Sequence, residues 1–159
     1  MTVMNRPRTV TAVLAAITLA ACGEPTGPAD DLARNRARWE AQGYVDYEFV
    51  FQRLCYCDDA AVAPVQIRVE DGAVAGVIDT LGQPVDSLEV AWYFTITIDS
   101  LFDIVESAIA RPAHRLTVQY HEEFGYPERI AIDWIGDAVD DEVTYEAGLL
   151  LPFSPAPVP

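Results

Sequence analysis

Short stretches in which apolar side chains occupy every second position recur along the chain. In the stretch 45–52, Tyr47, Phe49 and Phe51 follow this spacing. A period of two is typical of a strand that buries one face. The same pattern predicts six strands, at 45–52, 65–70, 73–78, 116–121, 130–134 and 143–147.

Two short sequences between these stretches indicate tight turns. Asp71-Gly72 separates the second and third stretches, and Asp-Gly favours a hairpin because its central residues tolerate positive φ. Gly125-Tyr126-Pro127 separates the fourth and fifth stretches. Strands joined by turns this short pair antiparallel.

A second spacing, of three and four residues, predicts two helices. The first covers 31–42 and ends at Gly43. The second begins at Thr97 or Asp99 and ends before Pro112. Its apolar positions are Leu101, Phe102, Val105, Ala108 and Ile109.

The order helix, strands, helix, strands indicates an α+β fold. We expect a single domain, with one antiparallel sheet of about six strands and two helices packed on one face. The other face of such a sheet is left for water or a partner.

The amino end has the three zones of a secretory signal. Arg6 and Arg8 precede an apolar run at 10–19, which is too short to span a membrane. The run ends in Leu19-Ala20-Ala21-Cys22, which resembles the lipobox of bacterial lipoproteins. This resemblance implies cleavage before Cys22 and lipid on its thiol. A plain signal peptide with an incidental cysteine is the alternative.

These boundaries divide the chain into four parts. We expect a lipoprotein signal peptide at 1–21, a lipidated cysteine and tether at 22–31, the α+β domain at 32–151, and a disordered proline-rich tail at 152–159. The predicted location is the cell envelope, with the domain lipid-anchored to a bacterial membrane. A tether this short keeps the domain close to the bilayer.

The chain is strongly acidic. It contains 25 acidic and ten basic residues, all of the basic ones Arg, and its formal net charge is −15. Such a surface repels nucleic acid and anionic lipid. Solubility is one interpretation of the charge, and a cationic partner or divalent ions are another. Three arginines fall in the first predicted helix, where they could face lipid head groups or pair with acidic neighbours: Arg34, Arg36 and Arg38.

If lipid occupies Cys22, two cysteines remain, Cys55 and Cys57. An exported location favours a disulfide between them. Residues two apart in a strand have Cα atoms about 6.6 Å apart, near the upper limit for a disulfide, so a bond requires a bulge or a strand end. We consider three interpretations of the two cysteines: a structural disulfide, a redox-active pair and a metal site. A metal site would need further ligands.

Acidic residues cluster after the fifth predicted strand, at Asp137, Asp140, Asp141 and Glu142. Carboxylates at this density are calcium candidates, although their spacing does not match an EF-hand loop. A solvated turn is the alternative. His121-Glu122-Glu123 has the residue types of acid–base catalysis but falls in a predicted hairpin loop. We expect no metal and no cofactor.

Several motifs together resemble a family of uncharacterised bacterial lipoproteins, domain of unknown function 6174. The family order is a lipobox, a helix with Trp, a Tyr-rich strand, C-x-C, a hairpin, a second helix, a G-Y-P segment and a late D-E pair. The corresponding residues here are Cys22, Trp39, 44–51, Cys55-Tyr56-Cys57, 67–72, 97–102, 120–133 and Asp141-Glu142. His121 stands where the family pattern has Asp. The resemblance implies a fold and a location but no activity.

Two hypotheses for function follow. The first is a non-catalytic module of the envelope that binds a protein or a small ligand or has a structural role. It predicts an exposed sheet face with aromatic side chains and no cleft where ionisable groups converge. The second is a thiol-redox or enzymatic protein built on Cys55 and Cys57, which predicts a solvent-reachable pair with a cationic neighbour such as Arg53. The membrane is a partner through the lipid in both, and the oligomeric state is open.

Overall fold

The computed structural model describes residues 27–153, which form one antiparallel sheet with helices on one side. The strands are β1 (Tyr47–Cys55), β2 (Val65–Glu70), β3 (Ala73–Ile78), β4 (Arg115–Tyr120), β5 (Pro127–Asp133) and β6 (Val143–Pro152). The helices are α1 (Pro28–Glu40), α2 (Asp59–Val62), α3 (Ser87–Tyr93) and α4 (Ile98–Ala110). The predicted α+β class and the six strands are confirmed.

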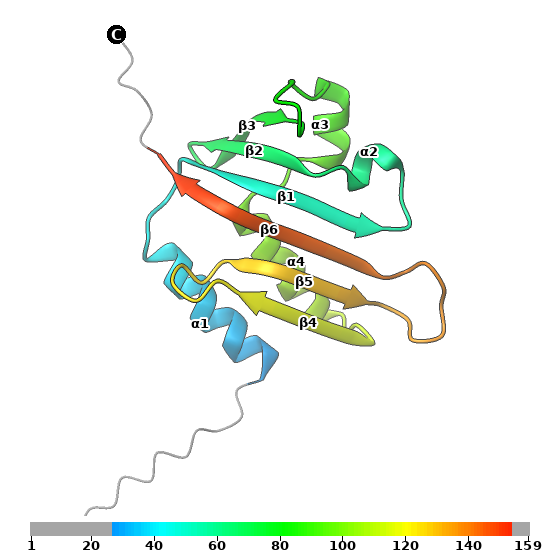
Figure 1. Ribbon diagram of the computed structural model, residues 1–159. Coiled ribbons are helices and arrows are strands. Elements are labelled where there is room, and N and C mark those ends of the chain that lie inside the picture. Colours follow the sequence, from blue (N-terminus) through cyan, green and yellow to red (C-terminus); the bar gives the residue numbers. More distant parts are fainter. Residues whose placement is uncertain (1–26, 154–159) are drawn as a thin grey trace, which may run out of the picture.

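The strand order in the sheet is β3-β2-β1-β6-β5-β4, with every neighbouring pair antiparallel (Figure 1). Strands β1–β3 are neighbours in the sheet, and so are β4–β6, so the two halves of the sheet meet where β1 pairs with β6. This seam carries the longest register, from Tyr47 opposite Pro152 to Cys55 opposite Val143. It therefore holds the two halves of the domain together.

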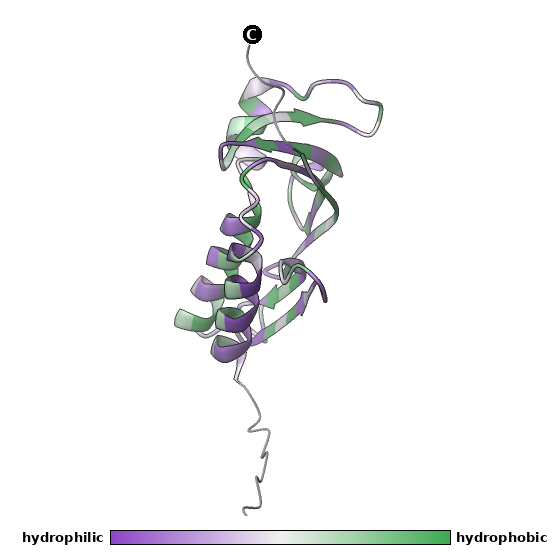
Figure 2. Cartoon of the chain, turned by 90° about the vertical axis from the view of Figure 1, so that its left-hand side faces the viewer, coloured by the Kyte–Doolittle hydropathy of each residue, from purple (hydrophilic) through white to green (hydrophobic). Residues whose placement is uncertain are grey.

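The two long helices, α1 and α4, lie side by side against one face of the sheet (Figures 1 and 2). Their contact includes a hydrogen bond from the indole Nε1 of Trp39 to Oδ1 of Asp99, at 3.1 Å. The opposite face of the sheet carries no described helix. The prediction of two helices on one face is therefore confirmed, with α2 and α3 as short additions.

The core lies between the helices and the sheet. Trp39 is at its centre, with ring centroids 5.4 Å from Tyr47, 5.9 Å from Tyr44 and 6.1 Å from Tyr126. The main buried side chains of the sheet and of α4 are Phe49, Phe51, Ile67, Val69, Ile98, Leu101, Phe102, Val105, Ile130 and Ile132. All of these lie within the described residues, so a chain that begins at residue 23 keeps the complete core.

Several boundaries differ from the prediction for local reasons. The first helix begins at Pro28 rather than Asp31, because proline fits the first helical position, where its missing N–H is not needed. The first strand begins at Tyr47, because the Val45 carbonyl accepts a hydrogen bond from Gly72 instead of a sheet partner. The second helix begins at Ile98, with Thr97 and Ser100 forming a capping box.

The last strand is longer than the alternation indicates. It continues from Ala147 to Pro152, so Pro152, which the sequence assigns to the tail, is the last residue of β6. Leu149 has φ +50, and the register shifts opposite Glu48 and Val50. This bulge interrupts the period of two that the prediction relied on. Residues 1–26 and 154–159, which include the signal peptide, Cys22 and the rest of the tail, lie outside the described residues.

Helices α2 and α3 were not predicted. In α3, Leu88, Val90 and Trp92 alternate with other residues, which is a strand-like period. The signal for a helix was Asp86, whose Oδ1 accepts the Leu88 N–H at 2.9 Å as an N-cap. Within residues 27–153 no helix has the length and apolar character needed to cross a membrane.

Candidate functional site

The predicted disulfide is present at the end of β1. Cys55 is the last residue of the strand, and its Cα atom lies 5.3 Å from that of Cys57. This separation is shorter than the extended spacing of about 6.6 Å. The strand therefore ends where the bond forms, as the spacing argument requires.

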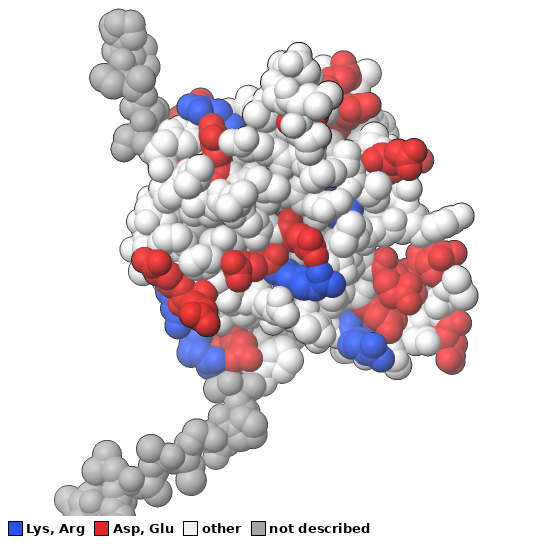
Figure 3. Space-filling model, in the orientation of Figure 1, with Lys and Arg blue, Asp and Glu red and all other residues white. Residues whose placement is uncertain are grey.

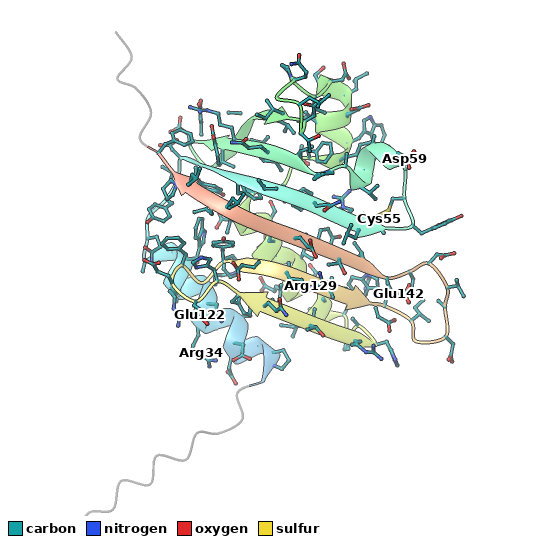
Figure 4. All side chains as sticks on the ribbon, in the orientation of Figure 1. Arg34, Cys55, Asp59, Glu122, Arg129 and Glu142 are labelled. Carbon is teal, nitrogen blue, oxygen red and sulfur yellow. A yellow bond between two sulfur atoms is a disulfide. The ribbon has the colours of Figure 1, made fainter. Side chains whose placement is uncertain are left out.

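The disulfide lies in acidic surroundings. Figure 4 shows Cys55, Asp59 and Glu142 at the same end of the sheet, and Cys55 pairs with Val143, the residue after Glu142. Acidic neighbours disfavour a thiolate, so these surroundings do not favour a reactive cysteine. Cys57 is exposed, and Tyr56 between the two cysteines is 83% exposed.

Arg53, the predicted cationic neighbour, is engaged elsewhere. It donates a hydrogen bond to the Tyr93 carbonyl oxygen at 3.2 Å, and its guanidinium carbon lies 5.6 Å from the ring centroid of Tyr145. Arg53 thus connects β1 to the end of α3 and to β6. These contacts give it a structural role beside the disulfide.

The acidic loop between β5 and β6 has the geometry of a turn. Asp141 accepts a hydrogen bond from the Ile135 N–H at 2.6 Å, and Asp140 has φ +74. Across residues 27–153, no three His, Cys, Asp or Glu side chains come together as a metal site would require. The calcium candidates Asp137, Asp140, Asp141 and Glu142 therefore do not converge on one point.

His121 organises the loop between β4 and β5. Its Nδ1 accepts the N–H groups of Glu123 and Phe124, both at 3.2 Å. The imidazole also stacks on Phe124 and Tyr126, with centroid distances of 4.8 and 4.9 Å. These contacts engage the ring and one of its nitrogens, so His121 has a structural role here.

The arginines of α1 pair with protein groups. Arg36 contacts Asp103 and Glu106 of α4 at 3.1 Å each. Arg38 donates to the carbonyl oxygen of Glu122 at 3.1 Å, and Arg34 pairs with Asp31. Arg34 and Arg36 therefore pair with acidic side chains, as one of the interpretations predicts, whereas Arg38 bonds to a backbone carbonyl oxygen and to Oδ1 of Asn35.

A cleft of about 590 Å³ opens between α4 and the adjoining ends of β5 and β6. We call it the Trp134 cleft. Its lining comprises Asp103, Ile104, Ser107, Ala110, Arg111, Trp134 and Tyr145. Aromatic and aliphatic side chains form most of this surface, with a few polar groups, which is the usual character of a small-molecule site.

Arg111 is the distinctive polar group of the cleft. Its guanidinium carbon lies 4.2 Å from the ring centroid of Trp134, a stacked arrangement that fixes the planar group over the indole. Among the described residues no hydrogen bond or ion pair to this guanidinium is present. Its N–H donors are therefore available to an anion, whereas Asp103, which also lines the cleft from α4, is paired with Arg36.

The uncovered face of the sheet is polar. It carries the ion pair between Arg129 and Glu146. Figure 4 labels Arg129 near the middle of this face, and Figure 3 shows a basic side chain beside acidic ones there. A groove of about 490 Å³ beside this pair is lined in part by Val50, Gln52 and Gln119. The aromatic residues of the described strands pack toward the helices instead. The strands therefore do not place the expected aromatic side chains on the free face, because those rings pack in or against the core. Phe153, just after β6, lies against Arg68.

Three tyrosines have strongly raised pKa values. Burial is the first cause in each case and raises the pKa of Tyr47, Tyr120 and Tyr126 to about 12. Each ring packs in or against the core, and none of them lines the Trp134 cleft. These shifts therefore reflect packing rather than a group prepared for proton transfer.

Sequence reasoning missed the Trp134 cleft. Its residues come from the end of one helix and the ends of two strands, which periodicity cannot place relative to one another. The sequence held one indication of this cleft. Arg111 and Trp134 are large side chains, and each lies at the end of a predicted element, next to a turn.

The model of one protein family, described as a family of unknown function (DUF6174), matches residues 31–150. No curated protein and no solved structure matches the chain.

Proposed function

The chain belongs to this family of unknown function, and from that premise we propose that it is an exported lipoprotein whose domain binds a ligand without transforming it. In this proposal a lipid on Cys22 holds the domain to a bacterial membrane in the cell envelope. The Trp134 cleft is the ligand site.

The lipobox Leu19-Ala20-Ala21-Cys22 supports the anchor. Helix α1 begins at Pro28, so the five residues 23–27 connect Cys22 to the domain, and Cys22 and Pro28 lie at most about 20 Å apart when this segment is extended. That distance keeps the amino end of α1 close to the lipid head groups. Because the chain is acidic, with a formal net charge of −15, anionic lipids repel its surface, and in this proposal the covalent lipid supplies the attachment.

The observation that carries the binding role is the stack of Arg111 on Trp134 at the Trp134 cleft. A flat apolar group can pack against Trp134, Ile104 and Tyr145, while an anionic group meets the guanidinium. We infer a ligand with an apolar or aromatic body and one carboxylate, sulfonate or phosphate. Asp103, which also lines the cleft, is paired with Arg36, so its negative charge is partly neutralised toward an anionic ligand.

The anchor is tested with a Cys22→Ala variant of the full chain expressed in a bacterium with lipoprotein processing. We expect the wild-type protein to partition into the detergent phase and to carry a mass increase on the peptide that begins at Cys22. The variant should lose both properties. A wild-type protein that partitions into water, or whose amino terminus lies elsewhere, would exclude the anchor.

The cleft is tested on the lipid-free domain, residues 23–159. The chain has three tryptophans, one in the core (Trp39), one on α3 (Trp92) and one in the cleft (Trp134), so indole N–H resonances report on three separate places. We use anilinonaphthalene sulfonate as an anionic probe and phenylnaphthylamine as its neutral analogue. Trp134 should shift most, and the anionic probe should bind several-fold more tightly.

The matched variant is Arg111→Gln, which keeps the length of the side chain and removes its charge. It should abolish the preference for the anionic probe and leave Trp39 unchanged. If both probes shift Trp92 but not Trp134, the cleft is not the ligand site.

The second candidate is a thiol-redox or enzymatic protein that uses Cys55 and Cys57. The exposure of Cys57 favours it, because a reductant in solution can reach the bond. The binding role is better supported, since Arg53 is engaged by Tyr93 and acidic residues surround the disulfide. The two candidates differ in what reduction of the disulfide does to the protein, as argued in the Discussion.

A further inference from the structure

Helix α3 presents apolar side chains to solvent. Leu88 and Trp92 are 69% and 78% exposed, and no residue of α3 is fully buried. The two residues are four apart, so they lie on the same face of the helix. We call the surface formed by Leu88 and Trp92, with the acidic residues beside it, the α3 surface.

The inner side of the same helix is firmly attached. Val90 and Tyr93 pack against the core, and the Tyr93 hydroxyl donates a hydrogen bond to Oδ2 of Asp58 in the neighbouring loop, at 3.1 Å. The Tyr93 carbonyl oxygen accepts the hydrogen bond from Arg53. Trp92 is therefore held out on a fixed backbone, and a partner that buries it does not have to order the helix first.

The surroundings of these two side chains are acidic. Glu89 lies on α3 and Asp86 is its N-cap, while Asp59 is the first residue of α2, which contacts α3, and Asp58 is the N-cap of α2. Figure 3 shows acidic side chains over this corner of the molecule. Residues 69–110 contain no Arg, Lys or His, and a basic group from outside this stretch, Arg53 of β1, reaches α3 only at the Tyr93 carbonyl oxygen of its inner side.

The exposed apolar side chains and the acidic residues beside them together limit which kind of partner can bind the α3 surface. A second copy of the chain would bring the same acidic residues against these, and a membrane surface rich in anionic lipid would be repelled. The α3 surface and the amino end of α1 also lie at opposite ends of the molecule in Figures 1 and 2. A domain anchored through residues before α1 therefore turns α3 away from the bilayer. Residues 154–159 carry no basic side chain and do not match the charge.

We propose that the α3 surface docks a basic amphipathic helix of a partner protein. The apolar face of that helix covers Leu88 and Trp92, and its Lys or Arg side chains pair with Asp86, Glu89 and Asp59. Tryptophan at the centre of an interface contributes disproportionately to affinity, and a surrounding charged rim sets orientation and partner choice. Only one step of this proposal rests on the proposed function, namely that the lipid anchor turns α3 away from the bilayer.

The test uses the lipid-free domain and a synthetic 18-residue amphipathic helix of Leu and Lys, with a Leu and Glu peptide of the same pattern as its counterpart. We expect saturable binding of the Lys peptide that shifts the indole N–H resonance of Trp92 and weakens as salt rises. The Trp92→Ala variant should raise the dissociation constant at least tenfold. The double variant Asp59→Asn and Glu89→Gln should raise it several-fold.

The control variant is Leu151→Ala, which removes an exposed leucine from β6 and should leave the dissociation constant unchanged. Equal binding of the Glu peptide, or equal binding by the Trp92→Ala variant, would overturn the proposal. It also fails if sedimentation shows a dimer of the domain that Trp92→Ala abolishes, or if the lipid-free domain binds anionic vesicles through Trp92. Because Trp134 and the lipid are not involved in this measurement, its failure leaves the proposed function intact.

Discussion

The hydroxyl oxygen of Tyr47 accepts a hydrogen bond from the backbone N–H of Ile98, at 3.1 Å within the buried core. Tyr47 is the first residue of β1 and Ile98 is the first residue of α4. The N–H groups of a first helical turn have no partner inside the helix. The central strand of the sheet thus supplies one partner and fixes where α4 begins.

Replacing Tyr47 with Phe should destabilise the domain. The ring and its packing remain, but the buried N–H of Ile98 loses its partner, and an unsatisfied buried donor costs about 1–2 kcal/mol. Denaturation in urea should show a lower midpoint with an unchanged slope. Tyr56→Phe is the control, because Tyr56 is exposed and should leave the midpoint unchanged. Equal stability of the Tyr47→Phe variant and the wild type would show that water replaces the hydroxyl.

The raised tyrosine pKa values predict a loss of stability in alkali. Burial raises the pKa of Tyr47, Tyr120 and Tyr126 from 10.0 to about 12. Between these values the folded state keeps protons that the unfolded state releases, so the free energy of unfolding falls as pH rises from about 10 to 12. Below pH 10 these groups contribute no pH dependence.

Absorbance of tyrosinate during alkaline titration provides the measurement for this prediction. Three of the seven tyrosines should ionise late and together with unfolding, in addition to Tyr93, whose pKa is raised mainly by its hydrogen bond to Asp58 rather than by burial. If the Tyr47→Phe variant shows the same late-ionising fraction as the wild type, Tyr47 is not one of the protected groups.

The strands were predictable because one face of the sheet is buried and the other is free. Tyr47, Phe49 and Phe51 alternate with residues that face away from the helices, and this difference in environment appears directly in the sequence. The end of β6 was not predictable, because the bulge at Leu149 breaks the period. Helix α3 was missed because its apolar residues serve two surfaces, the core at Val90 and solvent at Trp92.

The candidate sites also differ in how far the sequence could predict them. Cys55 and Cys57 are two residues apart, so their pairing could be predicted from local spacing and a strand end. The Trp134 cleft combines Arg111 with Trp134 and Tyr145, and only the packing of α4 on β5 and β6 brings them together. The predicted fold implied that one face of the sheet is free. It did not show that this face is polar, because that depends on the aromatic rings of the strands packing on the helix side.

The disulfide gives a prediction that separates the two candidate functions. A bond that closes a loop of three residues removes little entropy from the unfolded chain, about 1.5 kcal/mol. The double variant Cys55→Ser and Cys57→Ser should lose roughly this much stability and keep the shift of Trp134 with the anionic probe. Thiol titration of the native domain should detect no free thiol.

The redox candidate expects a different outcome. Reduction by a glutathione buffer at physiological ratios would then be reversible, and the two thiols would react in the folded protein without loss of stability. That result would replace the structural role of the disulfide with a catalytic one.

Gly125 provides the sharpest test of how the loop between β4 and β5 meets α1. Its φ is +80°, and a Cβ atom there would lie 2.6 Å from the backbone oxygen of Asn35 and 3.0 Å from Cβ of Arg38. Backbone atoms of a helix cannot move aside cheaply, so Gly125→Ala combines conformational strain with a clash. We expect a loss of roughly 3 kcal/mol in the free energy of unfolding.

Gly82→Ala is the matched control for this substitution. Gly82 also has a positive φ, +76°, but a Cβ atom there meets nothing within 4 Å. This variant should lose only about 1 kcal/mol, the cost of a Cβ atom in the left-handed conformation alone. The indole resonance of Trp39 should move in Gly125→Ala, because α1 must shift relative to Tyr126, and it should stay in place in Gly82→Ala. Equal losses in the two variants would mean that the loop, rather than α1, gives way.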